Sequence, residues 1–389
     1  MRTVYLDNAA TTYPKPDAVL TAFQHAAQTA YGNAGRGAHA GARNAAELVF
    51  DTRLAIANTF GGEAERVVFA PNATHALNLA IKTLTPDNSH LLLSDIEHNA
   101  TLRPVAALKE RGVSYSLYRS YAENGRDTEA VLQSLEKGLR PNTAGVIACH
   151  RSNCLPIELP LMAIGEFCKK HRLFFIVDAS QSAGSAAISA EELSITALAA
   201  PSHKGLYGLR GSGFVMFSKS VPDESLRTLV EGGSGSDSRS LSMPSLLPER
   251  LEAGTLPVEA IAALKAGLAF VKTETPEAIA EKESYLARYL RARLLTLPEL
   301  RVYFPRRELH GIILFNHSKI NAATLASLLD QRGIALRDGL HCCPLAHRHT
   351  QTETSGALRA SFGYFNSERD ADELIYALKD ISTIRTPSP

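Results

Sequence analysis

A lysine and an aspartate follow two apolar runs in the middle of this chain, and their positions indicate chemistry. Asp178 directly follows the apolar run at 173–177, and Lys204 lies between Pro201 and the glycine-rich turns at 205–213. A carboxylate at the end of a buried strand must find a cation or a strong donor, because an unpaired buried charge is costly. A constrained lysine amine can form a Schiff base with an aldehyde cofactor whose protonated ring nitrogen pairs with the aspartate. The structural alternatives are a helix cap for Asp178 and a solvated surface amine for Lys204.

Two adjacent cysteines, Cys342 and Cys343, form a second group, with His341, His347 and His349 nearby. The spacing matches no common zinc motif, and we expect no metal. Burial as inert thiols is the usual fate of free cysteines. The surrounding polar residues, glycine and proline instead indicate a loop, in which the histidines and Arg337 would favour a nucleophilic thiolate.

These residues must be positioned by alternating strands and helices. Apolar runs at 67–69, 91–93, 145–149, 173–177 and 213–217 predict buried strands, and helical spacing lies between them at 42–60, 74–82, 127–137 and 161–171. This alternation predicts an α/β fold with a mainly parallel sheet. Ligands of such sheets bind beyond the carboxyl ends of the strands.

A strand-to-helix turn at Ala73 and Thr74 is a candidate anion site, because small residues there leave backbone N–H groups at a helix N-terminus. A simple cap by Asn72 or Thr74 is the alternative. No P-loop or GxGxxG motif accompanies the turn, so nucleotide binding is not indicated.

The later part of the chain predicts a smaller domain. Helices are expected near 258–271, 276–297, 322–332 and 368–381, with strands near 311–315, 334–337 and 357–362. We expect a large domain over 16–260 and a small α+β domain over 261–389, beside which residues 1–15 pack. The Gly/Ser-rich segment 231–238 is expected to be a flexible loop.

Composition excludes several classes of protein. The chain has 389 residues, 45% hydrophobic and 21% charged, and its net charge is 41 − 40 = +1. This gives no electrostatic reason to bind nucleic acid or an acidic membrane. No apolar run is long enough to cross a bilayer. Five cysteines without a CxxC pair favour a reducing, cytoplasmic setting.

The ordered motifs resemble a known family. They are Tyr5-Leu6-Asp7-Asn8-Ala9-Ala10, Glu97-His98-Asn99-Ala100, Val177-Asp178-Ala179-Ser180-Gln181, Ser202-His203-Lys204-Gly205, Glu252-Ala253-Gly254-Thr255 and Arg337-Asp338-Gly339-Leu340-His341-Cys342. Together they resemble the class V aminotransferase fold of pyridoxal-phosphate enzymes, specifically the cysteine desulfurases and selenocysteine lyases. The resemblance implies fold type I, with a seven-stranded sheet in the large domain.

The resemblance also implies residues that bind the cofactor, pyridoxal 5′-phosphate. Lys204 would carry it covalently and move the substrate proton, and Asp178 would keep its ring nitrogen protonated. Gln181 would donate to the phenolate oxygen, and His98 would stack on the ring. The phosphate would be held by Ala73, Thr74, Ser202 and His203. Thr255 would reach the phosphate of a second subunit, which implies a homodimer.

For the substrate, the resemblance implies L-cysteine, with Asn153, Arg337 and Arg359 as contacts; Arg359 would grip the α-carboxylate. Cys342 would take the sulfur as a persulfide and release L-alanine. The loop between His341 and Arg359 is short, as in the branch that needs a protein sulfur acceptor.

Some residues depart from the family pattern. Cys343 stands where relatives usually carry alanine, and is either a resolving thiol or a neutral replacement. Cys154 and His75 replace other residue types, and Leu256-Pro257 replace a Pro-Asn pair. Three alternatives therefore stay open: a lyase acting on selenocysteine or on other C–S bonds, an aminotransferase or epimerase, and a non-catalytic sulfur-relay subunit.

Overall fold

The computed structural model describes residues 3–35, 37–122, 127–235, 239–304, 306–308 and 310–383. The chain forms two compact units. The larger comprises Lys15–Arg151 and Leu159–Pro276, and the smaller comprises Met1–Pro14, Ser152–Glu158 and Glu277–Pro389. Two details differ from the expected division. The boundary follows α7 (Val258–Glu274), because that helix packs on α1 (Asp17–Thr29) and α2 (Ala40–Phe60), and the segment 152–158 joins the smaller unit.

A seven-stranded sheet forms the centre of the larger unit. Its strand order is β2-β8-β7-β6-β5-β3-β4, and β8 alone runs antiparallel to its neighbours. The strands are β2 (Val67–Ala70), β3 (His90–Ser94), β4 (Ser114–Tyr118), β5 (Thr143–Cys149), β6 (Phe174–Asp178), β7 (Ala197–Pro201) and β8 (Gly213–Phe217). Consequently β2, β3, β5, β6 and β7 end at the same edge of the sheet, as the sequence pattern predicts.

Five of these strands were predicted from apolar runs, because they are buried. The other two, β4 and β7, have no such run in the sequence. Most residues of β3, β6 and β8 are buried, as expected for a sheet covered on both faces. Strand β7 consists mainly of alanine, which has weak strand propensity, and packing alone makes it a strand. Strand β4 is an edge strand with exposed residues, and its polar sequence carries no buried-strand signal.

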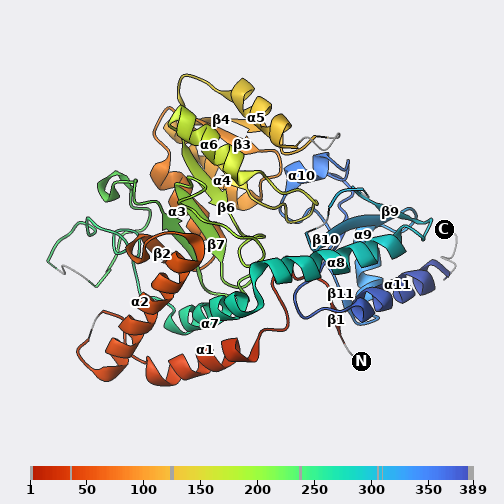
Figure 1. The fold of residues 1–389 in the computed structure, drawn as a ribbon, viewed down its shortest axis with the longest axis horizontal. Helices are drawn as coiled ribbons and strands as arrows, with labels where there is room; N and C mark the ends of the chain where they lie inside the picture. The colour runs from red at the N-terminus through yellow and green to blue at the C-terminus, as the bar shows by residue number, and fades with distance from the viewer. Residues whose placement is uncertain are drawn as a thin grey trace. The chain divides into compact units, whose positions relative to one another are not determined.

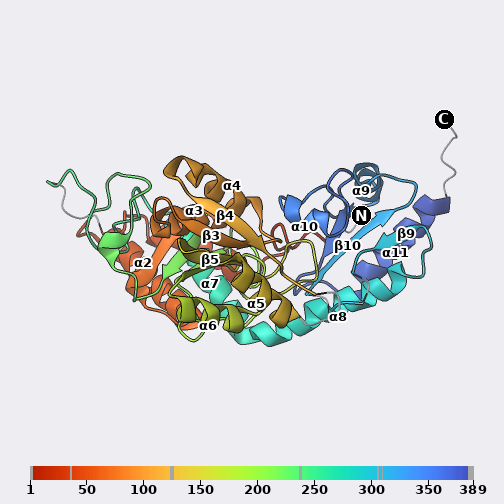
Figure 2. The ribbon, with the colours of Figure 1, turned by 90° about the horizontal axis from the view of Figure 1, so that it is seen from above.

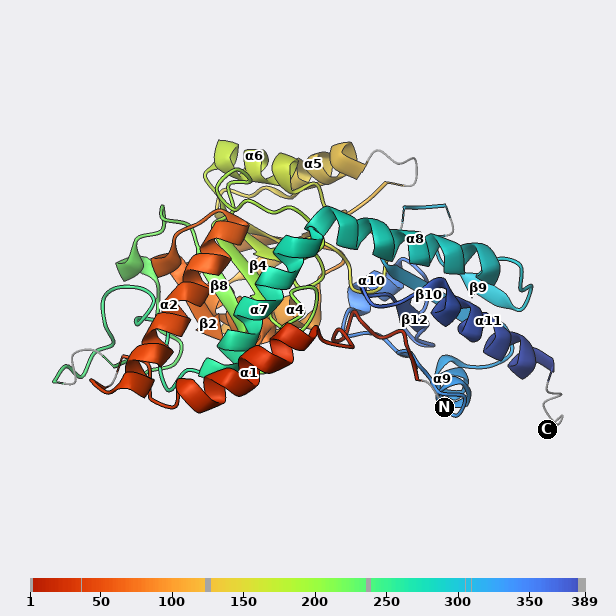
Figure 3. The ribbon, with the colours of Figure 1, turned by 60° about the horizontal axis from the view of Figure 1, so that its bottom comes forward.

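Helices cover both faces of this sheet. Figure 2 shows α3 and α4 on one face and α5, α6 and α7 on the other. Figure 3 shows α7 beside α1 and α2. The remaining helices of this unit are α3 (Ala73–Leu84), α4 (Asn99–Ala107), α5 (Asp127–Gly138) and α6 (Leu161–His171), with short 3₁₀ helices η1 (Ala64–Arg66), η2 (Leu108–Arg111) and η3 (Asp223–Ser225). Of the expected loop at 231–238, residues 236–238 lie outside the described residues.

The smaller unit has two small sheets. Antiparallel strands β12 (Leu358–Ser361), β10 (Ile312–His317) and β9 (Leu300–Val302) form one, in that order. The N-terminal strand β1 (Val4–Tyr5) pairs in parallel with β11 (Ile334–Ala335), so the start of the chain is part of this unit. The helices are α8 (Pro276–Leu294), α9 (Ala322–Asp330), α10 (Pro344–Arg348) and α11 (Glu368–Thr383). Helices α8 and α11 lie side by side, linked by Arg293 and Asp372 (Figure 1).

Within the described residues, no helix has both the length and the apolar character needed to cross a membrane.

Candidate active site

Asp178 is the last residue of β6 and lies at the carboxyl edge of the seven-stranded sheet. Its side chain is almost wholly buried, and Oδ1 accepts a hydrogen bond from the Ser180 amide at 2.9 Å. The backbone fixes the residue as well, because its carbonyl accepts from the His150 amide at 3.0 Å. A carboxylate held this firmly at a strand end can pair with a cationic ring nitrogen. Gln181 follows in the same turn and is half-buried.

Glu97 is a second carboxyl group close to Asp178, and the sequence analysis assigned it no role. It follows β3, is wholly buried, and its Oε1 accepts from the Ser94 hydroxyl at 2.5 Å and from the Cys149 amide at 2.7 Å. Burial, together with the negative charge of Asp178, raises the pKa of Glu97 to about 8 despite these hydrogen bonds. At neutral pH Glu97 therefore keeps its proton. Two features of the sequence could have pointed to Glu97: it lies in the motif 97–100, and it follows the apolar run of β3.

His98 is the N-cap of α4. Its Nδ1 accepts from the Ala100 amide at 3.0 Å, so the neutral ring carries its proton on Nε2. The ring is half-buried and its orientation is fixed by this bond. The predicted stacking of His98 on the cofactor stays a prediction.

Lys204 lies three residues beyond β7, in a tight turn. The turn is closed by a 2.8 Å hydrogen bond from the Tyr207 amide to the Lys204 carbonyl, and Tyr207 has a φ of 55°. Gly184 is required beside it, since a Cβ there would lie 1.9 Å from the Gly205 carbonyl oxygen. The half-buried Lys204 is thus presented by a constrained backbone, as the glycine-rich sequence predicts.

Positive charge gathers around this turn. The Lys15 ammonium donates to the His203 carbonyl at 2.9 Å, and burial with the charge of Arg210 lowers the pKa of Lys15 to about 7. Burial and the charges of Lys204, Lys15 and Arg210 lower the pKa of His203 to about 4. Such crowding of cations favours an anionic ligand, because a bound anion relieves their mutual repulsion.

Ser202 has a side chain suited to bind an anion. Its side chain is wholly buried, and its hydroxyl has no hydrogen-bond partner among the residues that the structure describes. Buried hydroxyls are normally satisfied. The orphaned hydroxyl and the surrounding cations therefore fit a phosphate group.

The start of α3 lies at the same sheet edge, after β2. Asn72 caps the helix, since its side chain accepts from the His75 amide at 2.9 Å. The helix cap by Asn72, which was the alternative to an anion site, is therefore present. Ala73 and Thr74 occupy the first turn of the helix. Backbone N–H groups in a first turn have no acceptor within the helix and can therefore bind an anion. Thr255 is exposed, just ahead of α7.

Arg359, on β12 of the smaller unit, is buried and held by two partners. Its Nη2 forms a 2.6 Å ion pair with Oδ1 of Asp7, and its Nη1 donates to the Asn153 carbonyl at 2.9 Å. Its Nε has no partner among the described residues. Arg359 was predicted from the sequence but its Asp7 partner was not, although Asp7 lies in the N-terminal motif.

Asn153 and Arg337 join Arg359 to the loop that carries Cys342. The Asn153 side-chain amide donates to the His341 carbonyl at 2.7 Å. The Arg337 backbone pairs with that of Arg359, and its carbonyl faces the His341 ring at 3.4 Å. The structure thus brings together four predicted residues of the smaller unit: Asn153, Arg337, Cys342 and Arg359.

Cys342 is exposed, in contrast to the other four cysteines. Both His341 and Cys342 have positive φ values, 52° and 57°, a conformation that side chains other than glycine adopt at a cost. Burial and the charge of Arg359 lower the pKa of His341 to about 3, so this ring is neutral. His341 therefore does not supply the positive charge that the sequence analysis expected beside the thiol.

Cys343 faces the interior rather than solvent. Its Sγ lies 3.1 Å from that of Cys154, and both thiols are wholly buried. The donor atoms of Cys154, Cys343 and His347 lie within 4.8 Å of one another and form the metal-compatible cluster found among the described residues. The two cysteines that depart from the family pattern are thus in contact.

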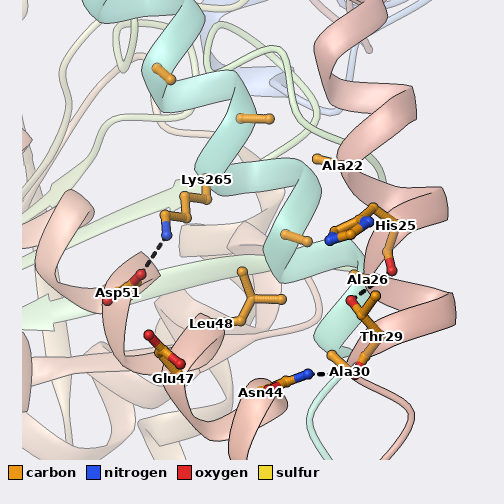
Figure 4. Close-up of a pocket in the computed structure, with 13 residues that line it drawn as sticks. Ala22, His25, Ala26, Thr29, Ala30, Asn44, Glu47, Leu48, Asp51 and Lys265 are labelled. Atoms are coloured by element: carbon orange, nitrogen blue, oxygen red, sulfur yellow. Dashed lines mark hydrogen bonds and ion pairs between the residues drawn. The ribbon is translucent and has the colours of Figure 1, made fainter. Parts of the chain in front are cut away.

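A pocket of about 590 Å³ lies elsewhere in the larger unit, between α1, α2 and α7 (Figure 4). Its lining is rich in alanine, and Lys265 forms a 2.6 Å ion pair with Asp51 across it. None of the predicted site residues lines this pocket. Two carboxylates, Glu47 and Asp51, line it beside Lys265, so it is less suited to a phosphate than the turn at Lys204.

Comparison with known proteins gives a consistent family. The profile described as "Aminotransferase class-V" matches residues 4–374. A probable cysteine desulfurase of Methanothermobacter thermautotrophicus is 27% identical over 383 residues, with 97% of this chain and 94% of that protein aligned. A cysteine desulfurase of Klebsiella pneumoniae is 30% identical over 392 residues, covering 97% of this chain and 93% of that protein.

Solved structures agree on the fold. The apo cysteine desulfurase of Thermococcus onnurineus superposes with a TM-score of 0.87 at 24% identity, covering 97% of this chain and 94% of the other. The cysteine desulfurase CsdA of Escherichia coli gives a TM-score of 0.85 at 25% identity, with the same coverage of both chains.

Proposed function

We propose that this chain, which belongs to the class-V aminotransferase family, is a pyridoxal-phosphate-dependent cysteine desulfurase. It would convert L-cysteine to L-alanine and hold the sulfur as a persulfide on Cys342. The observation that carries the proposal is the carboxyl edge of the seven-stranded sheet. There Asp178, Ser202 and Lys204 follow the neighbouring parallel strands β6 and β7.

The cofactor would be held by residues of the larger unit. The orphaned hydroxyl of Ser202, the side chain of His203 and the first turn of α3 at Ala73 and Thr74 suit its phosphate. Asp178 suits a protonated ring nitrogen, and the nearby Glu97 would stay neutral. Gln181 would donate to the phenolate oxygen and His98 would lie on the ring face.

When bound, the cofactor supplies an electron sink that weakens bonds at the α- and β-carbons of an amino acid. Lys204 would then move a proton at the substrate α-carbon, as a general base held by its turn. His98 carries its N–H on Nε2 and could donate that proton, since Nδ1 is engaged by the Ala100 amide.

Substrate recognition would come from the smaller unit. Arg359 is suited to grip an α-carboxylate in a bidentate pair. Its Asp7 partner occupies Nη2 and is partly exposed, so the substrate carboxylate would exchange with Asp7 at this position. Asn153 and Arg337 would complete the contacts.

Cys342 would act as the nucleophile that collects the sulfur. Its exposure suits both attack on a substrate and delivery of sulfur to another protein. The thiolate would attack the substrate sulfur, so that an S–S bond forms as the C–S bond breaks. We include a protein sulfur acceptor and a cytoplasmic location in the proposal.

A homodimer is also part of the proposal. The outer faces of α1 and α2 expose apolar side chains, including Phe23 on α1 and Phe50 on α2, which are 38% and 52% exposed. An apolar surface of this kind favours association. Thr255, exposed ahead of α7, would reach the phosphate of the second subunit.

The test measures alanine and sulfide formed from L-cysteine with a thiol reductant present. Wild type should form both in equal amounts, Lys204→Ala should form neither, and Cys342→Ala should lose sulfide while keeping the bound cofactor's absorbance. Release of selenide from selenocysteine, or of a thiol from an S-substituted cysteine, by Cys342→Ala would instead identify a lyase that needs no thiol nucleophile. Alanine formation by Lys204→Ala would contradict the proposal outright.

A further inference from the structure

Cys154 and Cys343 form a buried thiol pair that the proposed reaction does not use. Cys154 lies in segment 152–158 and Cys343 precedes α10, so 189 positions separate them in the chain. Their sulfur atoms are 3.1 Å apart, and neither side chain is exposed. His347 lies with them and is also wholly buried.

The sulfur–sulfur distance distinguishes between three kinds of site. Thiolates on one tetrahedral zinc ion would lie about 3.7 Å apart, given Zn–S bonds of about 2.3 Å. A disulfide requires about 2.05 Å. The observed 3.1 Å lies between these values. The two sulfur atoms are therefore nearer to each other than two ligands of one zinc ion would be, and already approach bonding distance.

The surroundings divide the roles between the two sulfur atoms. Burial alone would raise the pKa of Cys154, but hydrogen bonds from Cys343 and His347 outweigh it and lower this pKa to about 6. His347 is held in place, because its Nε2 lies 3.1 Å from His341 Nδ1 and its Nδ1 lies 2.7 Å from Thr352 Oγ1. The contacts that favour a thiolate therefore gather on Cys154.

We propose that Cys154 and Cys343 are a redox-active dithiol that small, uncharged hydroperoxides oxidise to a disulfide. Cys154 is the attacking sulfur and Cys343 the resolving one. A small neutral oxidant is required because both sulfur atoms are buried. The exposed Cys342, next in the chain to Cys343, is not a member of the pair.

The reaction balances in two steps. The Cys154 thiolate attacks the terminal oxygen of the hydroperoxide, so that an S–O bond forms and the O–O bond breaks. The departing hydroxide or alkoxide takes a proton from solvent and leaves as water or as an alcohol. The Cys343 sulfur then attacks the Cys154 sulfenic acid; an S–S bond forms, the S–O bond breaks, and the oxygen leaves as water with the Cys343 proton. Two thiols are oxidised and one peroxide is reduced.

The test uses the full-length Cys342→Ala chain, which makes it independent of sulfur transfer. Reduced protein is treated with hydrogen peroxide, quenched in acid, alkylated and digested with trypsin and a glutamate-specific protease. Cleavage after Arg151 and Glu158 leaves Cys154 on a peptide without another cysteine. We expect the loss of two alkylatable thiols per chain and a cross-linked Cys154–Cys343 peptide that is absent after reduction.

Matched variants make the result specific. Cys154→Ser and Cys343→Ser should each abolish the cross-link, whereas Cys168→Ser should leave it unchanged, because burial raises the pKa of Cys168 far above neutrality and keeps it unreactive. Wild-type protein treated in parallel should give the same Cys154–Cys343 cross-linked peptide without any substitution. Oxidation confined to Cys149 or Cys168, or no thiol loss at all, would overturn the proposal. Zinc bound at one ion per chain and lost in Cys154→Ser would overturn it as well.

Discussion

Replacing Glu97 by glutamine should make the stability of the protein less dependent on pH. Glu97 is buried, and its pKa rises from 4.5 to about 8. Between these values the native state holds a proton that the unfolded chain has lost. The free energy of unfolding therefore falls as pH rises through this window, and it becomes flat above the folded-state pKa.

The magnitude follows from the same two values. At about 1.4 kcal/mol per pKa unit, the full window is worth about 5 kcal/mol of unfolding free energy. Between about pH 6 and about pH 8 the part that Glu97 contributes is about 2 kcal/mol. Glutamine keeps an oxygen that can accept from the Ser94 hydroxyl and the Cys149 amide, and it has no proton to lose.

Urea unfolding followed by far-ultraviolet circular dichroism is the suitable assay, because the chain contains no tryptophan. Wild type should lose about 2 kcal/mol relative to Glu97→Gln between about pH 6 and about pH 8. The exposed Glu63→Gln is the matched control and should follow the wild-type curve. Parallel curves for wild type and Glu97→Gln would refute the argument that Glu97 is a protonated, buried acid.

Three further changes test other parts of the account. Arg53→Ala should cost about 3–5 kcal/mol of unfolding free energy in urea, because it leaves the Glu252 carboxylate buried without its 2.6 Å partner; a loss below 1 kcal/mol would contradict this. Arg359→Lys should raise KM for L-cysteine about 10-fold or more with a smaller change in kcat, since the proposed bidentate contact with the α-carboxylate would be lost; an unchanged KM would contradict a substrate contact for Arg359. Asp178→Asn should lower alanine formation about 100-fold or more while the urea midpoint changes little; full activity would show that Asp178 does not hold the cofactor's charge.

Local sequence signals were sufficient for most of the fold. Strands such as β6 are apolar because they are buried on both faces, and that burial is visible as a run of residues. The alternation with helices then gives the parallel sheet and its carboxyl edge, where Asp178 and Lys204 were expected. Strands β4 and β7 were missed, because an exposed edge and an alanine-rich strand carry no such run.

Pairing between distant residues could not be predicted in the same way. The contacts of Asp7 with Arg359 and of Cys154 with Cys343 join positions more than 180 residues apart, and no period or motif encodes them. The neutral state of His341 likewise depends on burial and on the charge of Arg359, which only the folded chain brings together. Glu97 belongs to a motif that the sequence shows, but its raised pKa comes from burial in the folded chain, which the motif does not indicate.

The most direct test of the central claim is mass spectrometry of the intact protein and of its cysteine peptides after incubation with L-cysteine and removal of excess substrate. The account predicts one additional sulfur atom per chain, on Cys342, released by a thiol reductant and absent from both Lys204→Ala and Cys342→Ala. Persulfide on another cysteine, or full formation of it in Lys204→Ala, would contradict the account.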